Sequence, residues 1–359
     1  MSKTILLEET LEMLDPTILI RDLVALRGPS GQEARVREWL AEQLQGLGYE
    51  PEVDPKGNLL VKVFGSSDRP HVVVTAHLDE IAMMVTKLEE SGKIRVAPVG
   101  GAYTFKWGEG PVEILAPAGI VPGILSFGCI HTNSAESVVE MARHLPYPWE
   151  HAYIFTGLNG AQLALAGIRP GLRVVLAESR RVVTEFGDYI ASYFLDDRAD
   201  LAVWLMALDA IRTSGTESLG AVTFAATTSE EIGAEGAQYL LRTHPADICV
   251  ALEIGPKTPE ADFAIDSQPT IWVRDGHAAM EAVDGDLLAE RCQAIGIFPH
   301  WQYLSRGGSD ASCAAAKGFT ARPVTLGLPV ENSHGYEIMH KDAPGELLRL
   351  LLDYLANVQ

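Results

Sequence analysis

Apolar runs and amphipathic stretches alternate along both ends of the chain. Residues 8–48 carry apolar positions at helical spacing, residues 59–64 alternate like a strand, and residues 71–76 form a β-branched run typical of a buried strand. After residue 195 the alternation resumes, with helices expected over 200–211, 233–242, 285–293 and 343–355, and strands over 221–226, 248–252 and 323–326. Strands that alternate with helices indicate an α/β fold, with a mostly parallel sheet sandwiched by helices.

The middle of the chain has a different pattern. Between Met84 and Val175 the sequence holds twelve Gly and seven Pro, and these residues bound short alternating runs at 112–115 and 123–127. The same segment carries seven Lys or Arg, seven Glu and no Asp, so it is formally neutral. We therefore predict a small β-rich domain at residues 84–175, inserted into a larger catalytic domain made of residues 1–83 and 176–359.

Charge and composition exclude several classes of partner. Lys plus Arg number 28 and Asp plus Glu 48, a formal net charge of -20, which disfavours binding to nucleic acid or to anionic membranes. No stretch approaches about 18 unbroken apolar residues, so no membrane span is expected. The N-terminus turns acidic too early for a signal peptide, and four scattered cysteines without a Cys-x-x-Cys pair suit a reducing compartment. We expect a cytoplasmic protein.

Polar clusters stand at the ends of predicted strands or at the starts of helices. They are His77 with Asp79, the pair Asp196-Asp197, the pair Glu230-Glu231, Glu253, and His334 in a turn near the C-terminus. Each cluster alone also fits a helix cap or a solvated strand end. Because open α/β sheets bind ligands at the carboxyl ends of their strands, we expect the clusters to converge on one crevice.

Taken together, these side chains have the composition of a two-metal site. Two histidines and three carboxylates provide five ligands, namely His77, Asp196, Glu231, Glu253 and His334. A shared Asp can bridge two cations about 3.5–4 Å apart. Imidazole with carboxylate suits Zn²⁺, Co²⁺ or Mn²⁺ better than Ca²⁺ or Mg²⁺. Glu230 is then left as a general base, and Asp79, two residues from His77 along an extended chain, can orient the imidazole.

The ordered set of motifs resembles the tetrahedral-aminopeptidase family of dinuclear metallopeptidases, which includes deblocking and glutamyl aminopeptidases. The matching residues are Gly28-Pro29-Ser30-Gly31 with Glu33, Ala76-His77-Leu78-Asp79-Glu80, Val99-Gly100-Gly101, Leu195-Asp196-Asp197-Arg198, Glu230-Glu231, Gly307-Gly308-Ser309-Asp310-Ala311 and His334. They cover nearly the whole chain, in order. The resemblance implies a zinc-exopeptidase-like fold with an inserted, small β-barrel-like domain for dimerisation and assembly.

The resemblance also implies roles for single residues. His77 and Glu253 would hold one metal, Glu231 and His334 the other, and Asp196 would bridge them. Glu230 would be the catalytic base, Asp79 would polarise His77, and a cis peptide would join Asp196 to Asp197. The loop with Gly308, Ser309 and Asp310 would line the substrate site.

The activity implied is release of N-terminal residues from peptides by a metal-dependent aminopeptidase with two divalent ions, Zn or Co first and Mn next. A homo-oligomer, from a dimer up to a dodecamer, is expected. Residues 128–160 fit the family pattern poorly, Glu253 stands where many relatives have Asp, and Ser309 replaces Thr.

Three alternatives remain open. The same dinuclear site could serve a deacylase or dipeptidase on small amides, and an endoglucanase-like hydrolase or a non-catalytic scaffold ranks lower. The preferred N-terminal residue is not fixed, although Lys257, Arg274, Arg306 or Arg322 could select acidic residues. The roles of His131, His277 and His340 are likewise open.

Overall fold

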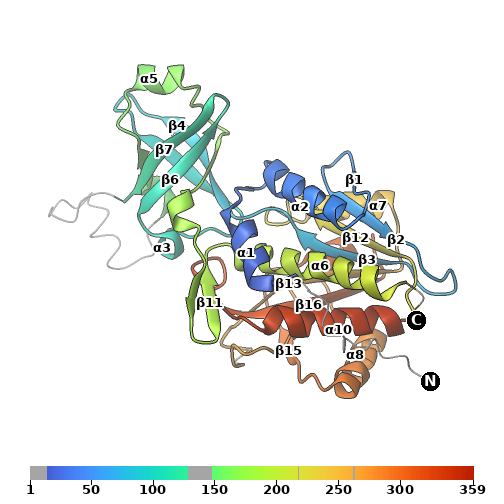
Figure 1. Ribbon diagram of the computed structural model, residues 1–359. Helices are drawn as coiled ribbons and strands as arrows, with labels where there is room; N and C mark the ends of the chain where they lie inside the picture. Colours follow the sequence, from blue (N-terminus) through green and yellow to red (C-terminus); the bar gives the residue numbers. More distant parts are fainter. Residues whose placement is uncertain (1–13, 128–147, 217, 262) are drawn as a thin grey trace.

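The β-branched run predicted as a buried strand forms β3 (Val72–His77), in the middle of a large sheet. The computed structural model describes residues 14–127, 148–216, 218–261 and 263–359. Within them, eleven strands form one sheet beside a closed barrel of six (Figure 1). The sheet runs in the order β1 (Glu52–Val53), β2 (Leu59–Val63), β12 (Val222–Thr227), β3, β13 (Ile248–Pro256), β16 (Arg322–Glu331), β17 (Glu337–His340), β11 (Tyr189–Ser192) and β10 (Thr184–Phe186). In addition, β14 (Thr270–Arg274) pairs with β16, and β15 (His300–Tyr303) pairs with β14.

The centre of this sheet is parallel and its margins are antiparallel. Strands β12, β3, β13 and β16 pair in parallel, whereas β2 and β17 pair with this centre in the opposite direction. The predicted α/β fold with a helix-covered sheet and an inserted barrel is therefore confirmed, and the parallel pairing is concentrated where the buried apolar runs lie. Of the antiparallel margins, β2 corresponds to the predicted strand at 59–64, whereas the periodicity does not single out β1, β10, β11 or β17.

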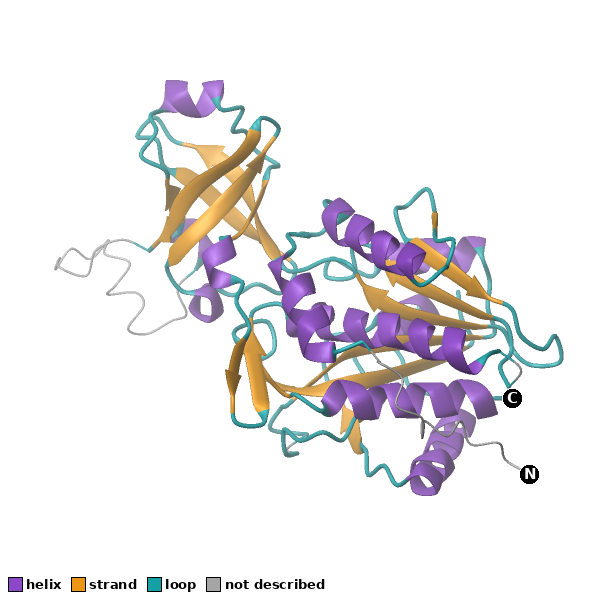
Figure 2. Ribbon diagram, viewed as in Figure 1, coloured by secondary structure: helices purple, strands orange, loops and turns teal. Residues whose placement is uncertain are grey.

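Helices cover both faces of the sheet, as Figure 2 shows for the nearer face. Val72 and Val74 of β3 pack into the larger core with the long helices, whereas Val73 between them faces a smaller core on the opposite side. This alternation is the two-residue period of a strand buried on both faces. The helices of this body are α1 (Pro16–Ala25), α2 (Ala34–Gly46), α6 (Leu195–Ser214), α7 (Glu235–Thr243), α8 (Ala282–Ile295), α9 (Asp310–Ala315) and α10 (Ala343–Asn357). Among the described helices, none has the length and apolar character needed to cross a bilayer.

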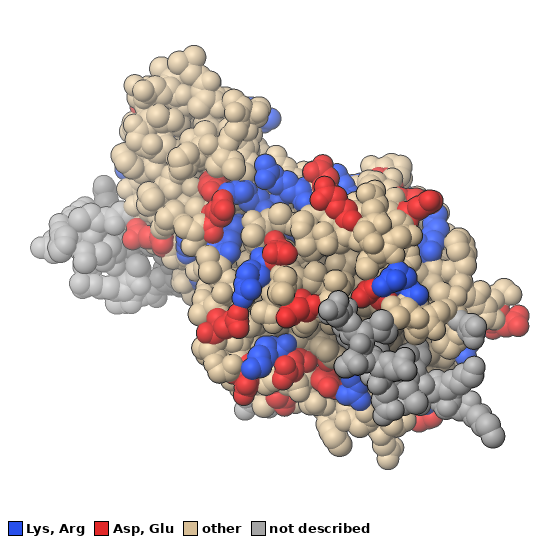
Figure 3. Space-filling view, viewed as in Figure 1, with Lys and Arg blue, Asp and Glu red and all other residues tan. Residues whose placement is uncertain are grey.

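The barrel lies between β3 and β10 in the sequence and has its own core. Trp107, Ile114, Leu125 and Val174 are fully or almost fully buried inside it. Its elements are β4 (Ala82–Leu88), β5 (Ile94–Val99), β8 (Tyr153–Phe155), β7 (Gly119–Ser126), β6 (Gly110–Ala116) and β9 (Arg173–Leu176), with the helices α3 (Thr104–Trp107) and α5 (Gly160–Leu165). Few charged side chains appear on the barrel face seen in Figure 3, in contrast to the body. The boundaries after residues 83 and 175 stay predictions.

A buried ionic cluster joins the two segments where the chain passes between body and barrel. Glu80 lies just before β4, and Arg181 lies shortly after β9. The carboxylate of Glu80 accepts hydrogen bonds from Arg181 and, at 2.9 Å, from Arg198 of α6. Arg198 also donates to the carbonyl oxygen of Leu78 at 2.6 Å. All three charged side chains are buried, so each depends on its partners for compensation.

Candidate metal centre and substrate cleft

The predicted ligands meet at the carboxyl ends of the central strands. His77 is the last residue of β3 and pairs in register with Thr227, the last residue of β12. Glu230 and Glu231 follow β12 after a short turn, and Glu253 lies within β13. The other two residues come from the start of α6, which supplies Asp196, and from the turn between β16 and β17, which supplies His334. The candidate ligands, which span the sequence from His77 to His334, are thus brought together at one edge of the sheet.

Two groups of donor atoms share the carboxylate of Asp196. One group contains His77, Asp196, Asp197 and Glu253, the other contains Asp196, Glu231 and His334, and within each group the donor atoms lie within 4.8 Å of one another. Oδ1 of Asp196 is 2.9 Å from Nε2 of His77, and Oδ2 is 3.4 Å from Nε2 of His334. One carboxylate therefore turns one oxygen to each imidazole, which is the arrangement of a bridging ligand.

The electrostatics of these groups suit bound cations. Burial raises the pKa of Glu230 and Glu253 well above the usual value and that of Glu231 to about 7. Burial also acts to raise the pKa of Asp196, but hydrogen bonds from His334 and His77 hold it below its usual value. Among the described residues, no Lys or Arg forms an ion pair with these four carboxyl groups. Crowded carboxylates beside imidazoles are stabilised by divalent metals of the zinc type, so the residues fit a dinuclear centre.

The peptide bond between Asp196 and Asp197 is cis, which confirms the sequence-based expectation. Asp197 turns back toward β3, where its Oδ2 accepts a hydrogen bond of 2.6 Å from the backbone N–H of His77. The structure also places Asp197 in the first group of donors, a position that the sequence analysis did not assign to it. The pair Asp196-Asp197 thus contacts the site with both side chains.

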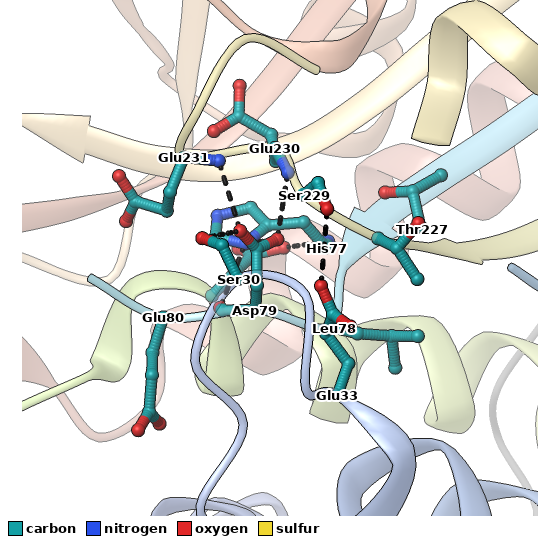
Figure 4. Close-up of polar contacts among 12 residues, drawn as sticks. Ser30, Glu33, His77, Leu78, Asp79, Glu80, Thr227, Ser229, Glu230 and Glu231 are labelled. Atoms are coloured by element: carbon teal, nitrogen blue, oxygen red, sulfur yellow. Dashed lines mark hydrogen bonds and ion pairs between the residues drawn. The ribbon is translucent and has the colours of Figure 1, made fainter. Parts of the chain in front are cut away.

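Asp79 connects the imidazole of His77 to the segment that carries the predicted base (Figure 4). Its Oδ1 lies 3.4 Å from Nδ1 of His77, and its backbone carbonyl lies 3.1 Å from the same nitrogen. Its carboxylate also accepts hydrogen bonds from the backbone N–H groups of Glu230 at 2.8 Å and Glu231 at 3.2 Å. Ser30 completes this set through its hydroxyl at 2.6 Å. Asp79 therefore positions both the histidine and the two glutamates.

The Gly28–Gly31 motif and Glu33 also stabilise the turn that precedes Glu230. The carboxylate of Glu33 accepts a hydrogen bond of 2.6 Å from the N–H of Gly31 and one of 3.3 Å from the hydroxyl of Ser229. Ser229, directly before Glu230, has a positive φ of 57°. A left-handed residue needs support from its surroundings. Glu33 and Asp79 supply that support on the two sides of the turn.

His334 is oriented by the inserted domain and by a carboxylate absent from the predicted site. Nδ1 of His334 lies 3.2 Å from the carbonyl oxygen of Gly101, and a Cβ added at Gly101 would come within 2.5 Å of that nitrogen. The buried Glu337 accepts hydrogen bonds from the backbone N–H groups of His334 at 2.9 Å and Asp196 at 3.1 Å. Glu337 thus ties two ligands together. The signal that could have found it is its spacing of three residues from His334.

The predicted substrate loop lies only partly on the cleft. A cleft of about 650 Å³ opens beside the ligands, and Gly308 lines it. Ser309 and Asp310 are buried behind its wall, where Ser309 caps α9 and Asp310 accepts a hydrogen bond of 2.5 Å from the hydroxyl of Thr227. These two residues support the loop, and contact of Gly308 with substrate stays a prediction.

Only some of the Lys, Arg and His side chains considered in the sequence analysis line the cleft. Arg306 and His277 line the cleft. Arg322 instead pairs with Asp284, Arg274 lies over the ring of Tyr303, and neither they nor Lys257 line it. His340 accepts a hydrogen bond from the N–H of Asp342, and His131 lies outside the described residues.

Comparisons with known proteins show which family and fold this chain resembles. The sequence profile of the M42 glutamyl aminopeptidases matches residues 57–350. The glutamyl aminopeptidase of Lactococcus lactis subsp. cremoris is 24% identical over 335 residues, covering 89% of each chain. The lysyl aminopeptidase of Pyrococcus furiosus is 24% identical over 239 residues, covering 66% of this chain and 65% of its own. The TET1 peptidase of Pyrococcus horikoshii has a similar fold, with a TM-score of 0.82, 23% identity, and coverage of 96% of this chain and 100% of its own.

Proposed function

Because the chain belongs to the M42 glutamyl aminopeptidase family, we propose that this peptide-bond hydrolase releases N-terminal residues at the cleft beside Asp196. The carboxylate of Asp196, shared between two groups of donors, is the observation that carries the proposal. His77 and Glu253 would hold one divalent cation, and Glu231 and His334 would hold the other. When bound, the two cations supply polarisation of the scissile carbonyl and a water of lowered pKa.

The chain's own residues supply binding and proton transfer. Glu231 and Glu253 line the cleft with carboxylates, which attract the α-ammonium group of a peptide and favour a free N-terminus. Glu230 also lines the cleft, and its backbone is fixed by Asp79. Its carboxylate accepts the proton of the attacking water and then delivers that proton to the leaving amine nitrogen. Asp79 keeps this base and the imidazole of His77 in a fixed relation.

The first experiment replaces the base and leaves the ligands in place. Glu230→Gln should lower kcat on a free peptide about 10²–10⁴-fold, since general bases typically contribute that much. Its metal content, measured by atomic emission, should equal that of the unchanged protein. Glu235→Gln makes the same replacement at an exposed carboxylate paired with Lys56, and full activity is expected. Undiminished turnover in Glu230→Gln would remove Glu230 from the role of base.

The substrate class is tested with matched peptides, free and N-acetylated. Stepwise, chelator-sensitive release of N-terminal residues from free peptides only is the expected result. Cleavage restricted to acylated or two-residue substrates would instead support the deacylase or dipeptidase alternative. Parallel loading with Zn²⁺, Co²⁺ and Mn²⁺, followed by calorimetric titration, ranks the metals, and we propose Zn²⁺ or Co²⁺ as the preferred ions because imidazole and carboxylate donors suit them.

Self-association is a further part of the proposal. The related TET1 peptidase is described as assembling into a tetrahedron or a large octahedral shell. We propose that this chain also forms a homo-oligomer, between a dimer and a dodecamer. Sedimentation velocity on the full chain measures the mass directly, and a single species at 38.8 kDa would contradict the proposal.

A further inference from the structure

Family membership leaves the preferred N-terminal residue undetermined. Two relatives of equal identity to this chain are named for substrates of opposite charge, one glutamyl and one lysyl. The preference has to follow from the cleft of this chain. In an aminopeptidase the α-amino group and the scissile carbonyl are both held at the reacting centre. The first side chain branches from the carbon between them, so it must contact the walls next to the ligands.

Part of the cleft wall is apolar. Trp272 comes from β14, and Leu304 follows β15. Both line the cleft and are only 5% and 6% exposed. The indole nitrogen of Trp272 is inaccessible to solvent. The surface that this wall presents to a ligand is therefore apolar.

The inserted domain adds aromatic surface to the same cleft. Tyr103 and Phe105, on either side of Thr104 at the start of α3, line it with more than half of each side chain exposed. Their rings are tilted neighbours with centroids 5.8 Å apart. Large exposed aromatic side chains at a cleft provide contact area for an apolar ligand.

The charged groups of the cleft do not form a pocket of one sign. Outside the ligand cluster and Glu230, its Lys, Arg, Glu and His residues are Lys106, Glu260, Arg306 and His277. Arg306, Glu260 and His277 are exposed to solvent. Lys106 belongs to the His334 end of the cluster, since a Cβ on the neighbouring Gly335 would lie 2.9 Å from its Cδ. A charged side chain set against Trp272 and Leu304 would lose water without gaining a partner.

We infer that the cleft selects peptides with a large apolar N-terminal residue, such as Leu or Phe, through the wall formed by Trp272 and Leu304. This inference rests on the proposed aminopeptidase function and names its substrate class. An acidic or basic first residue is disfavoured at this wall, unlike in the relatives named above. The physical basis is the burial of apolar side-chain area, opposed for Glu and Lys by desolvation of charge.

The test is a panel of tripeptides X-Ala-Ala, with X as Leu, Phe, Ala, Gln, Glu or Lys, and the metal-loaded full chain. Leu and Phe should exceed Ala, Glu and Lys in kcat/KM by about tenfold or more. The pair Gln and Glu isolates the effect of charge at equal size. Release led by Glu or Lys would overturn this inference alone. Absence of release from every peptide would overturn the proposed function and the inference with it.

A variant then assigns the preference to the wall. Leu304→Gln places an amide in the apolar surface and should lower the Leu-to-Gln ratio of kcat/KM at least threefold. The ratio is measured within one preparation, so it does not depend on the folded fraction. Leu165→Gln makes the same change on an exposed side chain of α5 that does not line the cleft, and its ratio should stay unchanged. An unchanged ratio in Leu304→Gln would contradict the role of the wall, and should that variant fail to fold, the panel on the unaltered chain decides.

Discussion

The orientation of His334 depends on a carbonyl oxygen of the inserted domain. Because a Cβ at Gly101 would approach Nδ1 of His334 to 2.5 Å, Gly101→Ala should displace the imidazole. Loss of a partner of this kind typically weakens metal binding 10–100-fold. Calorimetric titration with Zn²⁺ would measure the change. Gly345→Ala, where an added Cβ meets nothing within 4 Å, is the matched control, and equal affinities in both variants would refute the expectation.

Glu337 gives a second prediction for a single residue. Its two oxygens accept the N–H groups of Asp196 and His334, whereas a glutamine has only one acceptor oxygen. Glu337→Gln should therefore leave one buried N–H unpaired and weaken metal binding, again about 10–100-fold. The absorption spectrum of the Co²⁺-loaded protein should shift as the ligands move. Glu331→Gln, at the end of the neighbouring strand, serves as control, and a spectrum unaltered in both variants would argue against a positioning role.

Residue types at strand ends, at a helix start and in one turn, together with the family resemblance, led to the prediction of the five candidate ligands and Glu230 as one cluster. The parts of the site that escaped prediction act through the backbone. Glu337 accepts hydrogen bonds from two backbone N–H groups, and Asp197 accepts one from the N–H of His77. A sequence shows which side chains can ligate, but it does not show which main-chain donors will need a partner.

At the scale of elements, strong apolar runs were predicted and short strands were missed. The runs at 71–76 and 248–252 correspond to β3 and β13, both buried along most or all of their length. In contrast, β15 and β17 hold only four residues each, of which one in β15 and two in β17 are buried. Their pairing depends on partners far away in the sequence, so local periodicity carries little signal for them.

One ion pair fastens the inserted barrel to the body and yields a pH-dependent prediction. Arg27, after α1, forms two hydrogen bonds with Glu113 of β6, and both side chains are nearly buried. Burial acts to raise the pKa of Glu113, but the hydrogen bond and charge of Arg27 bring it below the usual value. A carboxyl group with a lowered folded pKa adds stability above its unfolded pKa, about 4.3, and loses that contribution as the pH falls through the folded pKa.

Glu113→Gln should therefore lower the free energy of unfolding at pH 7 by about 1.5–3 kcal/mol. The difference from the unaltered chain should shrink once the pH is brought below about 4.3. Urea unfolding at several pH values measures both effects. Glu90→Gln, at an exposed residue between β4 and β5, should show neither, and a difference for Glu113→Gln that stays constant with pH would contradict the assignment.

At the scale of the whole molecule, the metal centre should be a main source of stability. Carboxyl groups from α6, β13 and the segment after β12 face one another, and bound cations relieve their repulsion. Ligand at 100 times its Kd adds about 2.7 kcal/mol to the free energy of unfolding. Saturating Zn²⁺ should raise the Tm of the chelator-treated protein, and His334→Gln should reduce the gain. His244→Gln, away from the cleft, is the control, and a Tm insensitive to metal would refute the prediction.

The contact of Glu80 with Arg181 has a consequence for how such a chain can evolve. The side chains of these two residues, next to the points where the chain enters and leaves the barrel, are hydrogen-bonded to each other. The inserted module can therefore be regarded as exchangeable. Lengthening, shortening or replacing it would leave the strand order of the body intact. The exchange would still affect the site. Any new module would have to provide an acceptor for the imidazole of His334, which the carbonyl oxygen of Gly101 provides now. The fold at this junction tolerates a change of module, whereas the site requires that the acceptor for His334 be kept.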